Sequence, residues 1–328
     1  MKQLEPSSFV DAPVATTLYT NGEFVVGQSA SDWFAWRPGE PSLQWRHERQ
    51  ASLTGNNVSA VGETQVTSML DQGPARETTY ESRDLRTGEL LWTMRSDLRA
   101  GRQGLYHHGD QILLRGSSEQ GYFLARHRAE DGTELSRVEA PAGEVVVVLG
   151  QTVFFGSAKG LYVLRDAGAE RVQRLAVGWP VAVGKHLVVP MAAIAGATKL
   201  FVRWFDESGT ELAHTIHPCD GASGLPAVLD STTVAVATKS EGGVAVLRSG
   251  DLVWETQAPG WRTEMIAAGG DGLVAMRSQR QKAPSLIGYT DDGATYTITA
   301  TQPGHPWWLA GCTRGVVVSY RSGLVLLA

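Results

Sequence analysis

Cysteines, long apolar runs and export signals are scarce in this sequence, and each absence excludes a class of protein. The 328 residues include two cysteines, Cys219 and Cys312, which are too few for a disulfide framework. No apolar run reaches the roughly 18 residues that a membrane-spanning helix needs. The stretch from Met1 to Pro6 has neither an apolar core nor a cleavage site. We therefore expect no membrane insertion and a cytoplasmic location, although an exported protein trimmed of its signal would have the same sequence.

Positive charge is also in short supply. Lys and Arg together number 29 against 34 Asp and Glu, which gives a net charge of −5 and an isoelectric point near 5.9. A nucleic-acid groove needs clustered cations to neutralise phosphates. The local clusters of Arg99 with Arg102, and of Arg277 with Arg280 and Lys282, are typical of solvated loops. We expect no nucleic-acid partner.

Glycine, by contrast, recurs at a regular interval. The stretch from Arg83 to Trp92 has the pattern of a β-hairpin, in which a tight turn closed by Gly88 leads into an apolar strand. Successive turn glycines of this type are separated by 49, 44, 36, 41, 41 and 43 residues. Their mean spacing of about 42 residues is the length of a four-stranded propeller blade. These glycines are Gly39, Gly88, Gly132, Gly168, Gly209, Gly250 and Gly293.

A second series of turns marks the first hairpin of each repeat and has eight members. They are Asn21-Gly22, Gly62-Glu63, Gly109-Asp110, Gly150-Gln151, Gly184-Lys185, Asp230-Ser231, Gly270-Asp271 and Cys312-Thr313. The last repeat stops at Ala328 before a fourth strand can form, so we expect Lys2 to Glu5 to supply that strand and close the ring. If the short repeat around Gly168 were part of its neighbour, the ring would have seven blades instead of eight.

The two series together predict an all-β fold, an eight-bladed β-propeller of four-stranded antiparallel blades closed by the N-terminal strand. No linker interrupts the pattern, so we expect one domain over residues 1–328. The expected blades cover about 13–50, 53–97, 100–140, 142–176, 179–218, 222–258, 260–302, and 304–328 with 1–10.

The repeat resembles that of the PQQ-like, or quinoprotein-type, β-propellers. The resemblance is carried by Gln151 to Asp166 and by Arg83 to Trp92, and it extends in degenerate form over nearly all of the chain. It implies that Trp45, Trp92 and Trp254 on the outgoing strands dock neighbouring blades. Leu135, Val172, Leu212 and Tyr296 stand at that place in other repeats, so the docking pattern is partly kept.

The resemblance also suggests a quinone-dependent dehydrogenase, but the sequence departs from that pattern. It has no adjacent cysteines, and we find no set of quinone-stacking tryptophans with calcium ligands on the inner strands. We therefore expect no cofactor. Family members of this length without the cofactor site are binding platforms, and this resemblance implies the same role here.

The loops between blades and the loops between the second and third strands of each blade share one face around the channel mouth, and several large side chains map to it. Half of the ten tryptophans belong to this set, and Trp with Arg is the pairing enriched in binding hot spots. The alternative is that a tryptophan entering an inner strand plugs the channel or packs between blades. The candidate binding residues are Trp33, Trp179, His217, Trp261, Arg262, His305, Trp307 and Trp308.

Two functions remain open on this pattern. The first is a non-catalytic scaffold that binds a protein or peptide on the Trp-rich face. The second is a small-molecule lyase or hydrolase that uses His217 and His305 at the channel mouth. No nucleophile motif, phosphate-binding loop or recognised metal spacing supports the second, so we assign no catalytic residues and no metal ligands. The oligomeric state is not predicted.

Overall fold

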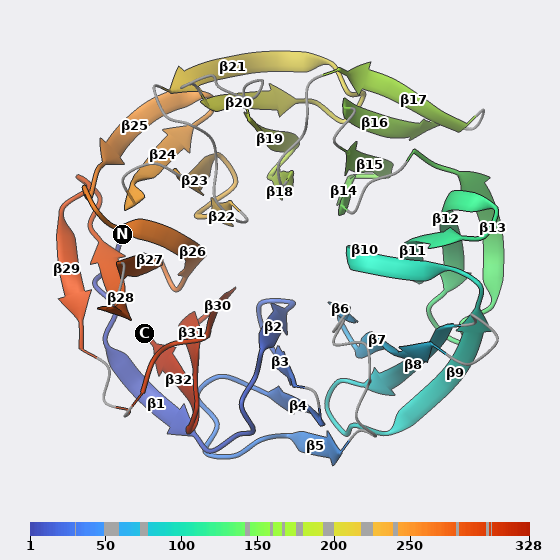
Figure 1. Ribbon diagram of the computed structural model, residues 1–328, viewed down its shortest axis with the longest axis horizontal. Helices are drawn as coiled ribbons and strands as arrows, with labels where there is room; N and C mark the ends of the chain where they lie inside the picture. Colours follow the sequence, from blue (N-terminus) through green and yellow to red (C-terminus); the bar gives the residue numbers. More distant parts are fainter. Residues whose placement is uncertain are drawn as a thin grey trace.

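The computed structural model describes residues 1–29, 31–48, 59–72, 78–141, 145–157, 160–165, 168–174, 180–192, 200–217, 226–238, 242–279, 282–299, 302 and 304–328. Its strands form eight four-stranded antiparallel blades arranged in a ring (Figure 1). In the first seven blades the chain runs from the innermost strand to the outermost, and in the last blade β30 to β32 run outwards and β1 is the outermost strand. The eight-bladed propeller predicted from the glycine spacing is thereby confirmed.

The first four blades contain these strands: β2 (Thr17–Thr20), β3 (Val25–Gln28), β4 (Asp32–Trp36) and β5 (Trp45–Glu48); β6 (Ser59–Val61), β7 (Gln65–Gln72), β8 (Thr78–Asp84) and β9 (Leu90–Ser96); β10 (Arg99–His108), β11 (Gln111–Ser118), β12 (Gly121–Arg128) and β13 (Glu134–Glu139); β14 (Val145–Leu149), β15 (Thr152–Ser157), β16 (Gly160–Arg165) and β17 (Gly168–Gln173).

The other four contain these: β18 (Val181–Val183), β19 (His186–Ala192), β20 (Leu200–Phe205) and β21 (Glu211–His217); β22 (Ala227–Val228), β23 (Thr233–Ala237), β24 (Val244–Arg248) and β25 (Asp251–Thr256); β26 (Arg262–Gly269), β27 (Gly272–Gln279), β28 (Lys282–Tyr289) and β29 (Thr295–Ile298); and β30 (Trp308–Cys312), β31 (Gly315–Tyr320), β32 (Gly323–Leu327) and β1 (Pro6–Val10).

Hydrophobic patterning explains which strands lie inside. Every residue of β31 is buried, as expected for a strand covered on both sides by neighbouring blades, whereas the first three residues of the outer strand β13 are exposed. Buried hydrophobic residues form eight clusters, one at each junction between adjacent blades. The core is therefore divided among the junctions, as in other repeat proteins.

The turn glycines have the backbone conformation that their spacing implied. All seven glycines of the Gly88 series have positive φ, the region that side chains disfavour. At Gly88 a Cβ atom would also lie 2.6 Å from Cγ of Trp45, on the outer strand of the preceding blade. The same contact pairs Trp92 with Gly132 and Trp254 with Gly293, so the three predicted docking tryptophans do pack on the next blade.

The ring is closed by the N-terminal segment, but not by the residues expected. Strand β1 pairs antiparallel with β32, and Phe9 lies opposite Val325 (Figure 1). Lys2 to Glu5 precede that strand: Leu4 is 1% exposed in the core between the last two blades, the Lys2 backbone N–H donates to Asp271 O, and Glu5 and Ala328 exchange backbone hydrogen bonds. The closing strand therefore begins at Pro6.

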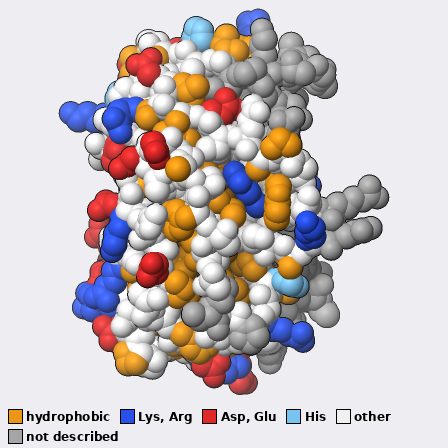
Figure 2. Space-filling view, turned by 90° about the vertical axis from the view of Figure 1, so that its left-hand side faces the viewer, with side chains coloured by type: hydrophobic (Ala, Val, Ile, Leu, Met, Phe, Trp, Pro, Cys, Tyr) orange, Lys and Arg blue, Asp and Glu red, His pale blue; other side chains and the backbone are white. Residues whose placement is uncertain are grey.

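On the outer wall of the ring, charged and hydrophobic side chains are interspersed (Figure 2). Several exposed hydrophobic residues belong to outer strands, among them Leu90, Leu135 and Leu252. In the part of the chain described here, no helix is long and apolar enough to cross a membrane.

Candidate binding face

One face of the propeller carries the segments through which the chain passes from the outer strand of one blade to the inner strand of the next. Arg262 begins β26 and Trp308 begins β30, the innermost strands of two adjacent blades. These strands belong to neighbouring blades and contact each other, so their first residues lie on the same face. Trp261, Arg262, Trp307 and Trp308 are therefore at the starts of two adjacent inner strands.

Trp307 is the most exposed part of this region. It is 53% exposed, whereas Trp261 and Trp308 are half-buried and every other tryptophan in the described residues is buried. Its backbone N–H donates to Ser319 O at 2.8 Å, and Pro306 before it is buried. The backbone is therefore held in place while the indole ring faces solvent.

Charged groups of the adjacent blade lie at the start of β26. The Arg262 side chain is 69% exposed, and its Nε atom lies 3.6 Å from Oε2 of Glu264. The other carboxylate oxygen of Glu264 accepts a hydrogen bond of 2.5 Å from the Ser278 hydroxyl. Glu264, on the same strand as Arg262, is held by Ser278 of β27, and most of the Arg262 guanidinium is open to a partner.

Trp33 does not belong to this surface. It lies in β4, the third strand of its blade, and is 0% exposed. Its ring packs edge-on against Trp45 with centroids 5.6 Å apart, inside the core cluster between the first two blades. Every residue of β4 is buried, so neither side of the strand faces the channel mouth. The prediction that Trp33 is a binding residue is wrong, and its role is packing.

The histidines named in the enzyme hypothesis are not brought together. His217 ends β21, the outermost strand of its blade, whereas His305 is an exposed residue that precedes the innermost strand β30, three blades further on (Figure 1). No group of three His, Cys, Asp or Glu side chains among the described residues is placed to hold a metal ion. Trp179 lies outside the described residues.

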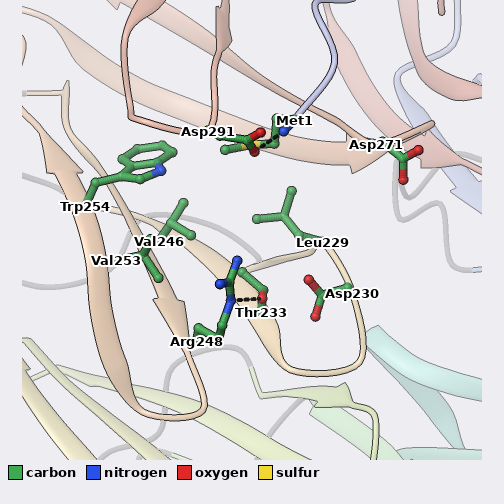
Figure 3. Close-up of a pocket in the computed structure, with 10 residues that line it drawn as sticks. All are labelled: Met1, Leu229, Asp230, Thr233, Val246, Arg248, Val253, Trp254, Asp271 and Asp291. Atoms are coloured by element: carbon green, nitrogen blue, oxygen red, sulfur yellow. Dashed lines mark hydrogen bonds and ion pairs between the residues drawn. The ribbon is translucent and has the colours of Figure 1, made fainter.

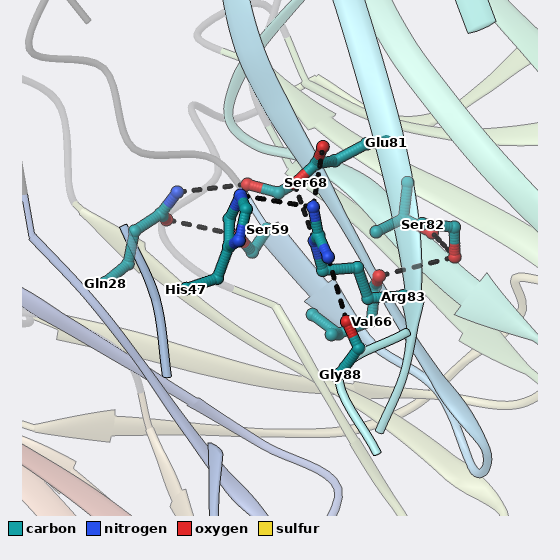
Figure 4. Close-up of polar contacts among 10 residues, drawn as sticks. Gln28, His47, Ser59, Val66, Ser68, Glu81, Ser82, Arg83 and Gly88 are labelled. Carbon is teal, nitrogen blue, oxygen red and sulfur yellow. Dashed lines mark hydrogen bonds and ion pairs between the residues drawn. The ribbon is translucent and has the colours of Figure 1, made fainter. Parts of the chain in front are cut away.

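Sequence reasoning missed a buried polar cluster at the junction of the first two blades (Figure 4). The Gln28 amide donates to Ser68 Oγ at 3.0 Å and accepts from Ser59 Oγ at 3.1 Å, and the two serine hydroxyls are 2.9 Å apart. All three residues are buried. The cluster joins strands β3, β6 and β7, so it fixes how the blades meet below the candidate face.

An arginine at the same junction is equally well paired. Arg83 donates to Glu81 Oε1 at 3.0 Å, to Gly88 O at 2.8 Å and to Nε2 of His47 at 3.1 Å (Figure 4). Because arginine can only donate, His47 accepts through Nε2 and its imidazole is neutral in this contact. The polar residues of β7 and β8 have the composition of exposed strands, and partners within the blade, such as Ser82 for Thr67, and on adjacent blades, such as Gln28 for Ser68, explain their burial.

Comparison with known proteins shows the fold. No family model and no curated protein matches the sequence. Among solved structures, BamB from Moraxella catarrhalis matches with a TM-score of 0.68 and 14% identity over 99% of this chain and 97% of that one. The C-terminal WD40 domain of Sif2 has a TM-score of 0.69 and 12% identity, covering 100% and 98%. The Dos1 propeller has 0.65 and 11%, covering 99% and 94%. At these identities, the similarity shows the β-propeller fold alone.

Proposed function

We propose that the protein is a non-catalytic scaffold that binds a protein or peptide through the face around Trp307. The observation that carries the proposal is the exposure of Trp307, at 53% of its surface, in a protein whose other described tryptophans are buried or half-buried. Leaving so large an apolar ring in water is unfavourable, and a partner that covers it recovers that cost. Trp261, Trp308, His305 and Arg262 form the remainder of the proposed surface.

The chemistry of this surface fits a polypeptide partner. Tryptophan and arginine are the residues most enriched among binding hot spots, and here they stand on adjacent inner strands. Arg262 supplies donors for a carboxylate or a main-chain carbonyl, and Trp307 supplies an apolar anchor. Both are carried by backbone segments at the starts of inner strands, so the loss of entropy on binding is confined mainly to the side chains.

We also propose that the chain belongs among the PQQ-like propellers without the quinone site. The repeat from Gln151 to Asp166 supports this assignment. The packing of Trp45, Trp92 and Trp254 on turn glycines of the following blades supports it further, because it is the docking contact that the resemblance implied.

The test compares wild type with Trp307→Ala and a matched control, Leu90→Ala, which removes a similarly exposed side chain from the outer strand β9. Tagged proteins are used for affinity capture from the native organism, and the affinity of any captured protein is then measured. Trp307→Ala is expected to weaken that affinity at least about tenfold, since a hot-spot tryptophan contributes about 2 kcal/mol or more. Leu90→Ala should retain it.

The free energy of unfolding distinguishes a binding role of Trp307 from a packing role. Because Trp307 is exposed, Trp307→Ala should leave the free energy of unfolding within about 0.5 kcal/mol of wild type. A captured partner that binds Trp307→Ala as tightly as wild type, or a large loss of stability in that variant, would contradict the proposal.

A further inference from the structure

Two of the three docking tryptophans have a hydrogen-bond acceptor for the indole N–H group, and the third, Trp254, has none among the described residues. Trp45 Nε1 donates to Leu85 O at 2.9 Å, and Trp92 Nε1 donates to Ala129 O at 2.8 Å. Trp254 occupies the same place on β25 and packs on Gly293 in the same way. It is only 9% exposed, yet its Nε1 atom has no hydrogen-bond partner among the described residues. A buried N–H group without an acceptor is unfavourable.

The turn between β28 and β29 explains the difference. In the other two junctions the turn glycine bonds four residues back, Gly88 to Asp84 O and Gly132 to Arg128 O. The carbonyl three residues before the glycine then faces the tryptophan of the preceding blade. Gly293 instead bonds three residues back, to Thr290 O at 3.0 Å. That carbonyl is directed into its own turn and is not bonded to Trp254.

A pocket of about 160 Å³ lies beside Trp254, whose indole N–H group has no acceptor among the described residues. It is between the blades β22–β25 and β26–β29, and the indole nitrogen of Trp254 is on the edge of the ring that faces the other lining residues (Figure 3). Leu229, Val246 and Val253 form apolar walls. An engineered apolar cavity of about 150 Å³ holds one benzene molecule, so this volume suits a single amino-acid side chain.

The charged lining residues favour a cation. Three carboxylates, from Asp230, Asp271 and Asp291, line the pocket against two cations, the Met1 amino group and the guanidinium of Arg248, which donates to Thr233 Oγ1 at 3.3 Å. Asp291 already pairs with a primary ammonium, the Met1 amino group. The pocket is therefore suited to an aliphatic stem that ends in a cation.

We propose that this pocket binds a lysine or arginine residue of an extended peptide. The aliphatic part of that side chain contacts Leu229 and Val246, its cation pairs with the carboxylates, and its main-chain carbonyl accepts the hydrogen bond of Trp254 Nε1. The pocket is lined by turn residues of the face opposite to Trp307, so the proposal does not depend on the proposed function.

The test uses the full chain labelled with ¹⁵N and titrated with Nα-acetyl-lysine amide to millimolar concentrations. The indole N–H signal of Trp254, identified by its absence from Trp254→Phe, should move in a saturable way. Nα-acetyl-norleucine amide, which has the same stem without the ammonium, should bind at least tenfold more weakly. No movement of the Trp254 signal, or equal affinity for the two probes, would overturn the proposal.

Three variants test the separate contacts. The double change Asp230→Asn with Asp271→Asn should weaken lysine-amide binding at least fivefold; asparagine suits both turn positions, including the positive φ of Asp271. Trp254→Phe, followed through the methyl signals of Leu229, should weaken it at least fivefold as well. Trp92→Phe is the matched control and should bind like wild type. Unchanged binding in either test variant would contradict the assigned contacts.

Discussion

Two junctions of the ring use the same packing contact with different polar groups. At the junction of β6–β9 with β10–β13, Trp92 packs on Gly132 and its N–H group is bonded to Ala129 O. At the junction of β22–β25 with β26–β29, Trp254 packs on Gly293 and its N–H group has no partner in the described residues. Both junctions thus repeat the packing of a tryptophan on a turn glycine, but only the first bonds the indole N–H group. At the second junction, the unbonded Trp254 lines a pocket.

The two junctions also differ in their histidine side chains. His107 and His127 belong to the first, where Nε2 of His107 lies 3.0 Å from Thr67 Oγ1 and Nδ1 of His127 lies 3.0 Å from Gly132 O. No histidine occurs in the sequence between His217 and His305, so the second junction has none. Protonation of histidine should therefore change the stability of the first junction and leave that of the second unchanged.

The largest loss of stability is expected when the contact between tryptophan and turn glycine, which both junctions share, is broken. Gly132→Ala and Gly293→Ala each place a methyl group about 3 Å from a tryptophan ring at positive φ. Backbone strain and overpacking together should cost about 3 kcal/mol in either variant. Gly109→Ala is the control, because it has positive φ with no atom within 4 Å of the new methyl group, and it should cost about 1 kcal/mol. Urea denaturation measures all three.

If the two junctions share the contact, Gly132→Ala and Gly293→Ala should be destabilised equally. A difference between them of more than about 1 kcal/mol would show that the packing, too, differs between the junctions.

Lowering the pH is expected to cause a smaller loss of stability, through His107. Burial lowers the pKa of His107 to about 4, below its ordinary value of 6.5. Above pH 6.5 the group is neutral in both states and contributes nothing. As the pH falls from 6.5 towards 4, the unfolded chain binds a proton that the folded protein does not, so stability is lost. Allowing for partial exposure, we expect a loss of about 1 to 2 kcal/mol between pH 7 and 5.

The control for this effect is His107→Gln, which keeps a polar group near Thr67 and removes the titration. Its stability should depend less steeply on pH between 7 and 5. Burial also lowers the pKa of His127, so some slope should remain. Hydrogen bonds from their own turns lower the pKa values of Asp84 and Asp131 below the ordinary 3.8, so these groups titrate outside this pH range. An unchanged slope in His107→Gln would contradict the assignment.

The sequence was sufficient for the fold because the repeating signal is local. Each turn glycine needs positive φ, seven of the eight repeats contain one, and the eight turns of the first hairpins complete the series, so the spacing of turns predicts the number of blades. The docking of Trp45, Trp92 and Trp254 was implied by the resemblance to the PQQ-like propellers, and their contacts with turn glycines of the following blades agree with it. Trp33 was misassigned because central blade strands are covered on both sides, which removes the alternation that distinguishes an inward from an outward residue.

The polar features were beyond the sequence for a related reason. Gln28, Ser59 and Ser68 are satisfied by one another across two blades, and no local pattern shows which polar residues will meet. The pocket at Trp254 depends on whether a turn closes at three or four residues. Thr290 and Ala129 stand at equivalent places before a glycine, and only the hydrogen bonds of the folded turns distinguish them.

The smallest expected effect isolates the indole N–H group. Replacing tryptophan by phenylalanine removes similar ring volume at Trp45, Trp92 and Trp254, but it breaks a hydrogen bond only at the first two. Trp45→Phe and Trp92→Phe should therefore cost about 1 kcal/mol more than Trp254→Phe in urea denaturation. Equal costs would mean that Trp254 N–H is bonded in solution. Saturating Nα-acetyl-lysine amide should then raise the stability of wild type and Trp92→Phe but raise that of Trp254→Phe much less, because a ligand stabilises only the folded state that binds it.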